Sequence, residues 1–160
     1  MGMITVGIAD LNIAQDPDVL ATYALGSCVG ICLYDPEIKL AGLAHIMLPM
    51  SSEASSSGTG NFRRYADTGI TELIQTMTLK GAVKARMTAK IAGGAQMFST
   101  GSAVFNIGER NVAAVKKMLG AYRIRIIAED TGSNYGRTVF FHADTGVMEV
   151  KAASKPTLML

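Results

Sequence analysis

The sequence predicts an α+β fold, a mixed α/β sandwich in which mixed, largely antiparallel β-sheets are covered by about two helices. Strand patterns outnumber helix patterns, and several neighbouring strands are separated only by turn signals, which is typical of hairpins. Strands and helices do not alternate regularly, which argues against a doubly wound parallel sheet. With 160 residues, of which 49% are hydrophobic and 18% charged, the chain predicts one packed domain over residues 1–160.

The first part of the chain is expected to be extended. Residues 4–9 alternate as a strand, residues 10–18 read as a loop, and residues 20–25 read as a second strand. Further on, residues 51–61 are rich in serine and glycine and predict a mobile loop, either a lid over a site or a simple connector.

Two segments carry helical spacing. Over residues 65–80 apolar side chains recur at i, i+3, i+4 and i+7, and Gly81 ends the pattern. The second helix is expected to begin at Asn106, with Glu109 at the spacing of a capping box, and to end at Gly120. Its expected buried face consists of Val112, Val115, Met118 and Leu119.

Strand patterns also dominate the second half. Residues 87–92 and 122–128 read as strands, the second with one solvated face, and a polar loop is expected over residues 129–137. Residues 138–143 and 147–151 flank a turn of the Asp-Thr-Gly type, which predicts a hairpin.

Composition excludes several classes of function. The net charge of +2, without any run of Lys or Arg, does not indicate a nucleic-acid partner, and no apolar stretch is long enough to insert into a membrane. No leader pattern is present, so a cytoplasmic protein with reduced cysteines is expected. The cysteines and histidines lack the spacing of a zinc site and no phosphate-binding glycine motif occurs, so neither a metal nor a cofactor is expected.

One predicted hairpin carries reactive side chains. Apolar runs at 28–34 and 40–48 flank the turn signal at 35–39 and predict an antiparallel pair. If opposed positions sum to 73, Cys28 faces His45, with Cβ atoms about 4.5–5.5 Å apart. A loop of odd length would shift the register by one residue and leave the pair diagonal.

A thiol beside an imidazole indicates nucleophilic chemistry. The free thiol is mostly protonated at neutral pH, so His45 is expected to take the proton of Cys28 or to stabilise its thiolate. Thr22 is expected to orient the ring through its hydroxyl or its carbonyl. Gly26 and Ser27 are expected to turn the chain and to aim backbone N–H groups at an oxyanion.

Structural roles are the alternative for each of these residues. A lone cysteine in an apolar strand is commonly a small buried hydrophobe. Cys32 lies four residues beyond Cys28, about 13 Å along the same strand, which excludes a disulfide between them and favours a buried role for Cys32. His142, beside two phenylalanines, also reads as structural.

A set of motifs in the chain resembles the CheD family of chemoreceptor glutamine deamidases. The matching residues run in the order of that family from about residue 6 to residue 150. They are Thr22, Leu25-Gly26-Ser27-Cys28-Val29, Ala44-His45-x-Met47-Leu48-Pro49, Tyr65-Ala66-Asp67, Lys90-Ile91-Ala92-Gly93-Gly94-Ala95-x-Met97, Asn106-Ile107-Gly108-x-Arg110-Asn111 and Glu129-Asp130-Thr131-Gly132. One departure is Ser133, where many members carry a second glycine.

The resemblance implies a function and a site. The catalytic cysteine, histidine and threonine of the family fall on Cys28, His45 and Thr22. The implied activity is that of a protein-glutamine glutaminase, which hydrolyses glutamine side chains on the cytoplasmic helices of methyl-accepting chemotaxis receptors to glutamate through a glutamyl thioester. The resemblance further implies hydrolysis of glutamyl methyl esters, a complex with a CheC-type phosphatase, and a fold similar to the catalytic domain of deamidating toxins.

Two other functions are also compatible with the sequence. The chain is alternatively a regulatory binding module that engages and activates a CheC-type phosphatase, with deamidation secondary. A cysteine peptidase is a third reading, which would cut receptor backbones and leave side chains unchanged.

Overall fold

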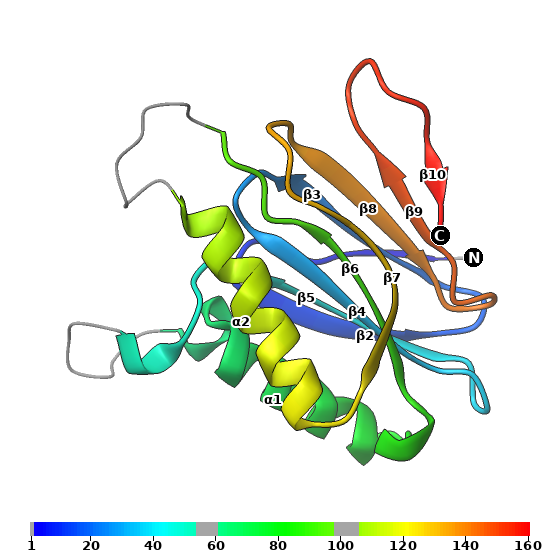
Figure 1. The fold of residues 1–160 in the computed structure, drawn as a ribbon. Helices are drawn as coiled ribbons and strands as arrows, with labels where there is room; N and C mark the ends of the chain where they lie inside the picture. Colours follow the sequence, from blue (N-terminus) through cyan, green and yellow to red (C-terminus); the bar gives the residue numbers. More distant parts are fainter. Residues whose placement is uncertain (1, 54–60, 98–105) are drawn as a thin grey trace.

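Two five-stranded β-sheets lie face to face, and two α-helices cover the outer face of one of them (Figure 1). This arrangement is seen in a computed structural model that describes residues 2–53, 61–97 and 106–160. Both sheets combine parallel and antiparallel pairs, with antiparallel pairs in the majority. The predicted α+β sandwich is therefore confirmed.

The first sheet carries none of the helices formed by the described residues, and it contains strand β1 near the N-terminus. Its order is β1-β3-β8-β9-β10, and only the β1–β3 pair is parallel. The strands are β1 (Met3–Thr5), β3 (Val19–Leu25), β8 (Arg137–His142), β9 (Met148–Lys151) and β10 (Leu158–Met159). The predicted hairpin of the second half forms β8 and β9.

The second sheet is the central layer of the molecule. Its order is β2-β5-β4-β6-β7, and only β6 and β7 are parallel, joined by the second helix in a single crossover. The strands are β2 (Asp10–Gln15), β4 (Val29–Asp35), β5 (Leu40–Ile46), β6 (Thr88–Gly93) and β7 (Arg125–Thr131). All seven residues of β5 are buried, because one face packs on the helices and the other on the first sheet.

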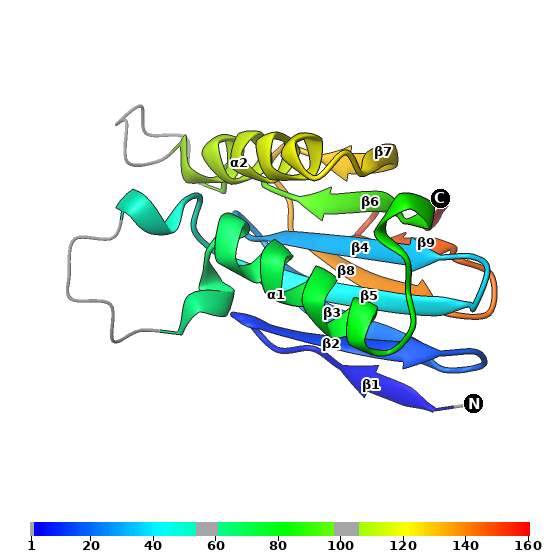
Figure 2. The same ribbon diagram turned by 90° about the horizontal axis from the view of Figure 1, so that it is seen from below.

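The helices α1 (Ala66–Leu79) and α2 (Ile107–Ala121) lie side by side on the central sheet (Figure 2). The apolar residues that predicted the first helix form its buried face. Short 3-10 turns lie beside them, namely η1 (Ser51–Glu53), η2 (Phe62–Arg64) and η3 (Lys84–Arg86). Among the described residues no helix is both long and apolar enough to cross a membrane.

Each layer boundary has its own hydrophobic core. The helices and the central sheet enclose one cluster, which includes Ile31, Leu73 and Leu119. The two sheets enclose the other, which includes Leu20, Leu43 and Phe141. Burial of apolar surface stabilises the packing at both boundaries. Between the sheets, the inward-facing side chains of each sheet contact those of the other.

The loop expected over residues 10–18 was a wrong prediction, because Asp10–Gln15 forms strand β2 at the edge of the central sheet. Leu11 and Ala14 are buried there, while Asn12 and Gln15 are exposed. Polar side chains fit such an edge strand, since one of its faces and its outer margin meet solvent. The strand expected over residues 4–9 is shorter than predicted and spans Met3–Thr5.

Strand β7 and helix α2 also differ from the elements predicted there. Strand β7 extends to Thr131, into the region expected to be a loop, because it pairs with β6 along its length. Helix α2 begins beside Asn106, but that side chain makes no capping hydrogen bond. Its buried face includes Gly108 and Asn111, whereas Val112 is only half-buried. Most of the loop predicted at residues 51–61 lies outside the described residues.

Candidate active site

The hairpin of β4 and β5 brings Cys28 and His45 to the same face, although not directly opposite one another. The register pairs Gly30 with His45, so opposed positions sum to 75 and not to 73 as predicted. Strand β4 continues to Asp35, and Lys39 closes the turn with a φ of 50°, which moves the centre of the turn along the chain. The pairing is shifted by two residues from the predicted one, so the side chains of Cys28 and His45 keep the same face of the sheet. Cys28 is then a diagonal neighbour of His45, two residues from the position directly opposite it.

That face is directed towards the first sheet. Cys28 and Cys32 both pack against the core between the sheets. A methyl group added to Gly30 would lie 3.2 Å from Leu25 and 3.7 Å from Thr22, which belong to β3 of the other sheet. His45, opposite Gly30, is fully buried at this boundary. The candidate site therefore combines residues of two sheets.

Thr22 fixes the orientation and the tautomer of the His45 ring. Its Oγ1 lies 2.7 Å from the Val6 carbonyl oxygen and 2.7 Å from Nδ1 of His45. A carbonyl only accepts, so the single hydroxyl hydrogen of Thr22 is donated to Val6. The Thr22 oxygen must then accept from a protonated Nδ1. The predicted contact is made by the hydroxyl, and the neutral ring carries its lone pair on Nε2.

The other ring nitrogen, Nε2, carries the lone pair of the neutral imidazole. It is buried and has no hydrogen-bond partner among the described residues. Burial lowers the pKa of His45 to about 4 from its ordinary value of 6.5, because the charged ring would lose its hydration. At neutral pH the ring is therefore a neutral base with a free lone pair.

The two cysteines differ in access. Cys28 is half-buried in the bend that precedes β4, whereas Cys32 is fully buried. Burial raises the pKa of the Cys28 thiol above its ordinary value of 9.0, and its own backbone N–H partly offsets the effect. Burial also raises the pKa of Cys32, which Lys90 only partly counteracts. Of the two thiols, only Cys28 is placed to meet a substrate.

These pKa directions describe a neutral pair at rest. A thiol with a raised pKa and an imidazole with a lowered pKa do not form a standing thiolate–imidazolium pair near pH 7. The arrangement suits general-base catalysis, in which Nε2 accepts the thiol proton as sulfur attacks an electrophile.

The bend at residues 26–28 supplies backbone donors. The Gly26 N–H donates to the Ala24 carbonyl at 3.1 Å, and Ala24 has a φ of 60° next to a β-bulge in β3. The N–H groups of Ser27 and Cys28 donate none of the backbone hydrogen bonds found among the described residues. Among the described backbone acceptors these two N–H groups have no partner, and the N–H of Cys28 faces its own thiol, whereas the N–H of Gly26 is occupied.

A residue that sequence reasoning did not assign, Asn111, contacts both ends of the hairpin. From α2 its Nδ2 donates to the Ser27 carbonyl at 2.9 Å and to the Met47 carbonyl at 3.1 Å. The side chain is fully buried. The available signal was a polar residue in phase with Gly108, Val115 and Leu119 on the buried face of the helix.

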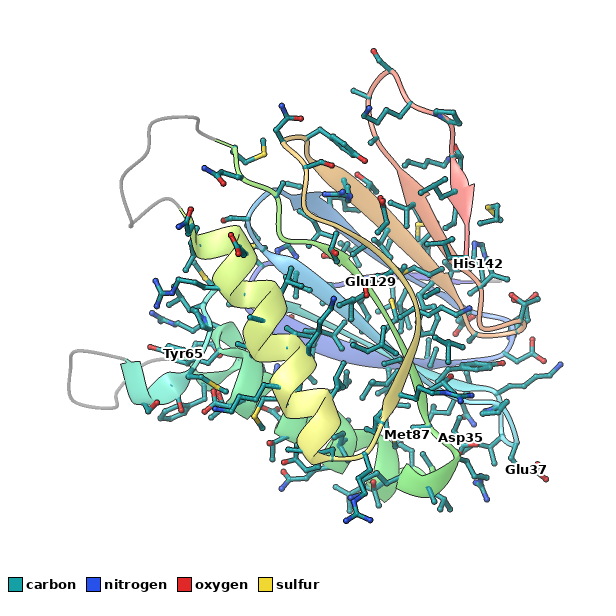
Figure 3. All side chains as sticks on the ribbon, viewed as in Figure 1. Asp35, Glu37, Tyr65, Met87, Glu129 and His142 are labelled. Atoms are coloured by element: carbon teal, nitrogen blue, oxygen red, sulfur yellow. The ribbon has the colours of Figure 1, made fainter. Side chains whose placement is uncertain are left out.

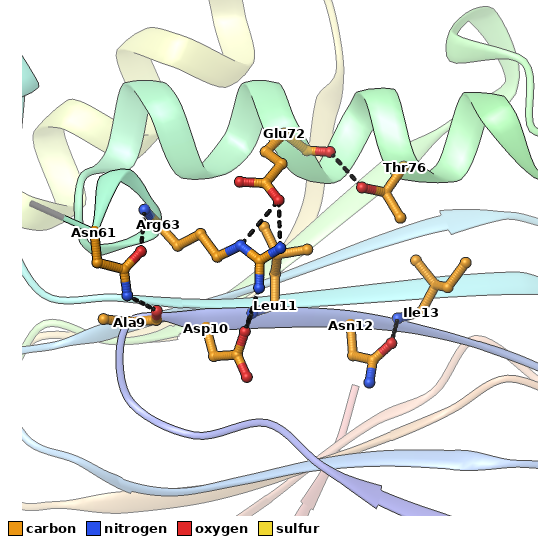
Figure 4. A network of polar contacts seen from close by, with 9 residues as sticks. All are labelled: Ala9, Asp10, Leu11, Asn12, Ile13, Asn61, Arg63, Glu72 and Thr76. Carbon is orange, nitrogen blue, oxygen red and sulfur yellow. Dashed lines mark hydrogen bonds and ion pairs between the residues drawn. The ribbon is translucent and has the colours of Figure 1, made fainter.

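A polar network holds the other margin of the site (Figure 4). The guanidinium of Arg63 lies between Asp10, at 2.7 Å, and Glu72, at 2.6 Å. Asn61 donates to the Ala9 carbonyl at 2.7 Å, and the Ala9 N–H donates to the His45 carbonyl at 2.9 Å. The segment that enters α1 is thereby tied to the strand that carries the imidazole.

His142 lies away from this site. It pairs with Val19 in the β3–β8 register, whereas Thr22 pairs with Val139, so three residues or roughly 10 Å separate the two positions. Its Nε2 bonds Glu149 at 3.0 Å. Figure 3 shows it at the opposite end of the molecule from Tyr65, which precedes α1. Within the described ranges no three His, Cys, Asp or Glu residues gather as metal ligands.

Comparison with known proteins identifies relatives over nearly the whole chain. The family model CheD, described as CheD chemotactic sensory transduction, matches residues 47–152. A protein of Lachnoclostridium phytofermentans named "Probable chemoreceptor glutamine deamidase CheD" is 47% identical over 156 residues, which are 96% of each chain. Proteins of the same name from Caldanaerobacter subterraneus and Syntrophomonas wolfei are 51% and 52% identical, each over 93% of this chain and 92% of the relative.

A solved structure has a similar fold. The crystal structure of Neisseria meningitidis protein NMB0706, of the family model DUF152, superposes with a TM-score of 0.52. The superposition covers 83% of this chain and 64% of the other, at 11% sequence identity. At this identity the likeness concerns the fold alone.

Proposed function

The chain belongs to the CheD family, and on that premise we propose that it is a chemoreceptor glutamine deamidase. It hydrolyses glutamine side chains of methyl-accepting chemotaxis receptors to glutamate, with Cys28 as nucleophile, His45 as general base and acid, and Thr22 as the residue that orients His45. The names of relatives about half identical over most of the chain support this reaction. Because the proposed substrates are the cytoplasmic helices of receptors, the proposed reaction takes place in the cytoplasm.

The first half of the reaction forms a thioester. Sγ of Cys28 attacks the carboxamide carbon while its proton passes to Nε2 of His45. The N–H groups of Ser27 and Cys28 stabilise the oxyanion of the tetrahedral intermediate. The intermediate collapses as the C–N bond breaks, and Nε2 gives its proton to the leaving nitrogen, so ammonia departs.

The second half releases glutamate. Nε2, again neutral, takes a proton from water as the water oxygen attacks the thioester carbon. The C–S bond then breaks and the proton returns to the sulfur of Cys28. The sum is one water consumed and one ammonia released, without any oxidant or cofactor. A glutamyl methyl ester would follow the same course with methanol as leaving group.

One observation carries the proposal, namely the 2.7 Å contact between Oγ1 of Thr22 and Nδ1 of His45. It leaves the free lone pair on Nε2, which is the atom that the reaction needs as a base. A buried histidine with a purely structural role would be expected to have both ring nitrogens paired. Here only Nδ1 has a partner among the described residues.

Mass spectrometry of receptor peptides tests the proposal. Wild type and Cys32→Ala are expected to convert specific glutamines to glutamates, and Cys28→Ala is expected not to. Conversion that persists in Cys28→Ala would contradict the mechanism. Peptides cut at the backbone, with side chains unchanged, would indicate a cysteine peptidase instead.

A regulatory role is the second candidate. Large apolar side chains are exposed in the described ranges, including Ile8 at 58%, Tyr23 at 45%, Phe62 at 50% and Met97 at 46%. Such side chains suit a partner surface, and a CheC-type phosphatase is the partner that we propose. If binding is the main task, Cys28→Ala will stimulate that phosphatase as well as wild type does.

A further inference from the structure

We propose that Asn111 is a positioning residue that orients the backbone N–H of Cys28 towards the oxyanion. The inference rests on the proposed function, in which that N–H stabilises the tetrahedral intermediate. Asn111 does not touch the substrate in this proposal. It acts through the peptide group between Ser27 and Cys28.

The orientation of the Asn111 amide is determined by its contacts. Its Nδ2 has two carbonyl oxygens as neighbours, those of Ser27 at 2.9 Å and of Met47 at 3.1 Å. A flipped amide would place its own oxygen against both acceptors, which have no hydrogen to donate. Both donor hydrogens are therefore used, one for the end of each strand of the hairpin.

Peptide geometry transmits this contact to Cys28. The Ser27 carbonyl and the Cys28 N–H belong to one planar trans peptide, in which the two groups point in opposite directions. Since the carbonyl is held towards α2 by Asn111, the N–H is held pointing away from α2. That N–H donates to no backbone acceptor among the described residues, so it is available to an oxyanion.

The neighbouring carbonyls are held by other groups. The Gly26 carbonyl accepts from the Ala95 N–H at 2.8 Å, and the Cys28 carbonyl accepts from the Gly94 N–H at 2.8 Å. Three successive carbonyls are therefore fixed, and only the middle one is fixed by a side chain. A substitution at position 111 can release the peptide that carries the Cys28 N–H and leave the two flanking bonds in place.

The Asn111 side chain uses both of its donor hydrogens but leaves its acceptor oxygen unpaired among the described residues. Oδ1 of Asn111 is buried without a hydrogen-bond partner among the described residues. A buried polar atom without a partner destabilises a fold. At Asn111 that cost is offset by the two hydrogen bonds that Nδ2 donates to the Ser27 and Met47 carbonyls.

The test compares two reactions of the same sulfur in Asn111→Ala and in Asn111→Leu, which keeps the volume without donors. Deamidation of a receptor peptide passes through an oxyanion, whereas alkylation of Cys28 by iodoacetamide does not. We expect kcat for deamidation to fall on the order of 10²-fold, as for loss of one oxyanion donor. KM and the rate of alkylation are expected to stay close to wild type.

Controls separate the possible outcomes. Asn12→Ala removes an exposed asparagine of β2 and is expected to leave both reactions unchanged. Thermal unfolding reports whether each variant folds, and Asn111→Leu provides the test if Asn111→Ala does not. A parallel fall in alkylation and deamidation, or no fall in kcat, would overturn the proposal. A wild type that converts no glutamine contradicts the proposed function itself, and the role of Asn111 with it.

Discussion

The hydroxyl of Thr22 lies between the Val6 carbonyl and the His45 ring, and it brings no charge to the site. A carboxylate in that place would stabilise an imidazolium and raise its pKa. The uncharged Thr22 oxygen accepts a hydrogen bond from Nδ1 but does not stabilise a positive charge on the ring as a carboxylate would. Burial therefore determines the pKa of His45 and lowers it. The histidine therefore stays neutral, which keeps Nε2 able to act as the general base that we propose for Cys28.

Loss of the Thr22 hydroxyl tests this orienting role. In Thr22→Val the Nδ1–H of His45 loses its acceptor, so the ring is free to rotate or to change tautomer. We expect kcat for deamidation to fall on the order of 10²-fold. Thr22→Ser keeps the hydroxyl and is the control, with kcat expected within a few-fold of wild type. Equal activity of the Val and Ser variants would show that the hydroxyl does not orient the base.

The buried imidazole also makes folding sensitive to acid. The pKa of His45 is about 4 in the folded chain and near 6.5 when unfolded, so between these values the unfolded state binds more protons. Stability is therefore lost as the pH falls. Between pH 7 and pH 5 the loss from His45 is about 2 kcal/mol. Urea unfolding of wild type and His45→Asn measures it, and identical pH slopes in the two proteins would exclude this assignment.

At the scale of elements, the first turn of α2 is pressed against the end of β6. A methyl group on Gly108 would lie 2.3 Å from the Ala95 carbonyl oxygen, and one on Gly94 would lie 2.2 Å from Val112. Gly94 also has a φ of 65°, which favours glycine. The N–H of Gly94, which follows β6, donates to the Cys28 carbonyl at 2.8 Å. Close packing of the helix thus supports the bend that presents the thiol.

Substitution of Gly108 tests this close packing. In Gly108→Ala the new methyl group overlaps backbone, which cannot move aside as a flexible side chain would. We expect a loss of roughly 1–3 kcal/mol in the free energy of unfolding, together with lower deamidase activity. Gly120→Ala, in the same helix and with nothing within 4 Å, is the matched control and is expected to be neutral or slightly stabilising. Equal stability of the two variants would contradict the argument.

Periodicity predicted the elements better than it predicted their partners. The spacing of Ile70, Leu73 and Met77 identified α1, because helix burial follows from local sequence. The register of Cys28 and His45 was predicted wrongly, because it depends on where the turn closes, here at Lys39. The two side chains still share a face because the register is shifted by two residues, whereas a shift by one would place them on opposite faces. The contacts of Asn111 join segments 64 and 84 residues apart, which no local pattern reveals.

At the scale of the whole molecule, the site exists only when the two sheets are packed. Thr22 belongs to β3 of the first sheet, while His45 belongs to β5 of the central sheet. Sequence patterns indicated largely antiparallel β-sheets with about two covering helices, but they did not show which strands belong to which sheet. That assignment depends on pairings such as β1 with β3 and β6 with β7, which are set by packing across the whole chain.

Lys90 connects the sheets on the side away from the helices. From β6 of the central sheet, its Nζ donates to the Gly146 carbonyl at 2.7 Å and to the Leu160 carbonyl at 2.9 Å. Gly146 lies in the turn between β8 and β9, and Leu160 directly follows β10, so both acceptors lie next to strands of the first sheet. Burial lowers the pKa of Lys90 somewhat, and Cys32 opposes the effect.

Replacement of Lys90 by methionine tests this connection, because the apolar stem is kept and both donated bonds are lost. We expect Lys90→Met to lower the free energy of unfolding by about 1–3 kcal/mol, since two partly buried carbonyls lose their donor. Amide hydrogen exchange is expected to accelerate at Leu160 and Met148, whose N–H groups pair with each other's carbonyls. Lys117→Met, at an exposed position on α2, is the control. Unchanged exchange at Leu160 in Lys90→Met would mean that the pairing of β9 and β10 holds this edge without help from the central sheet.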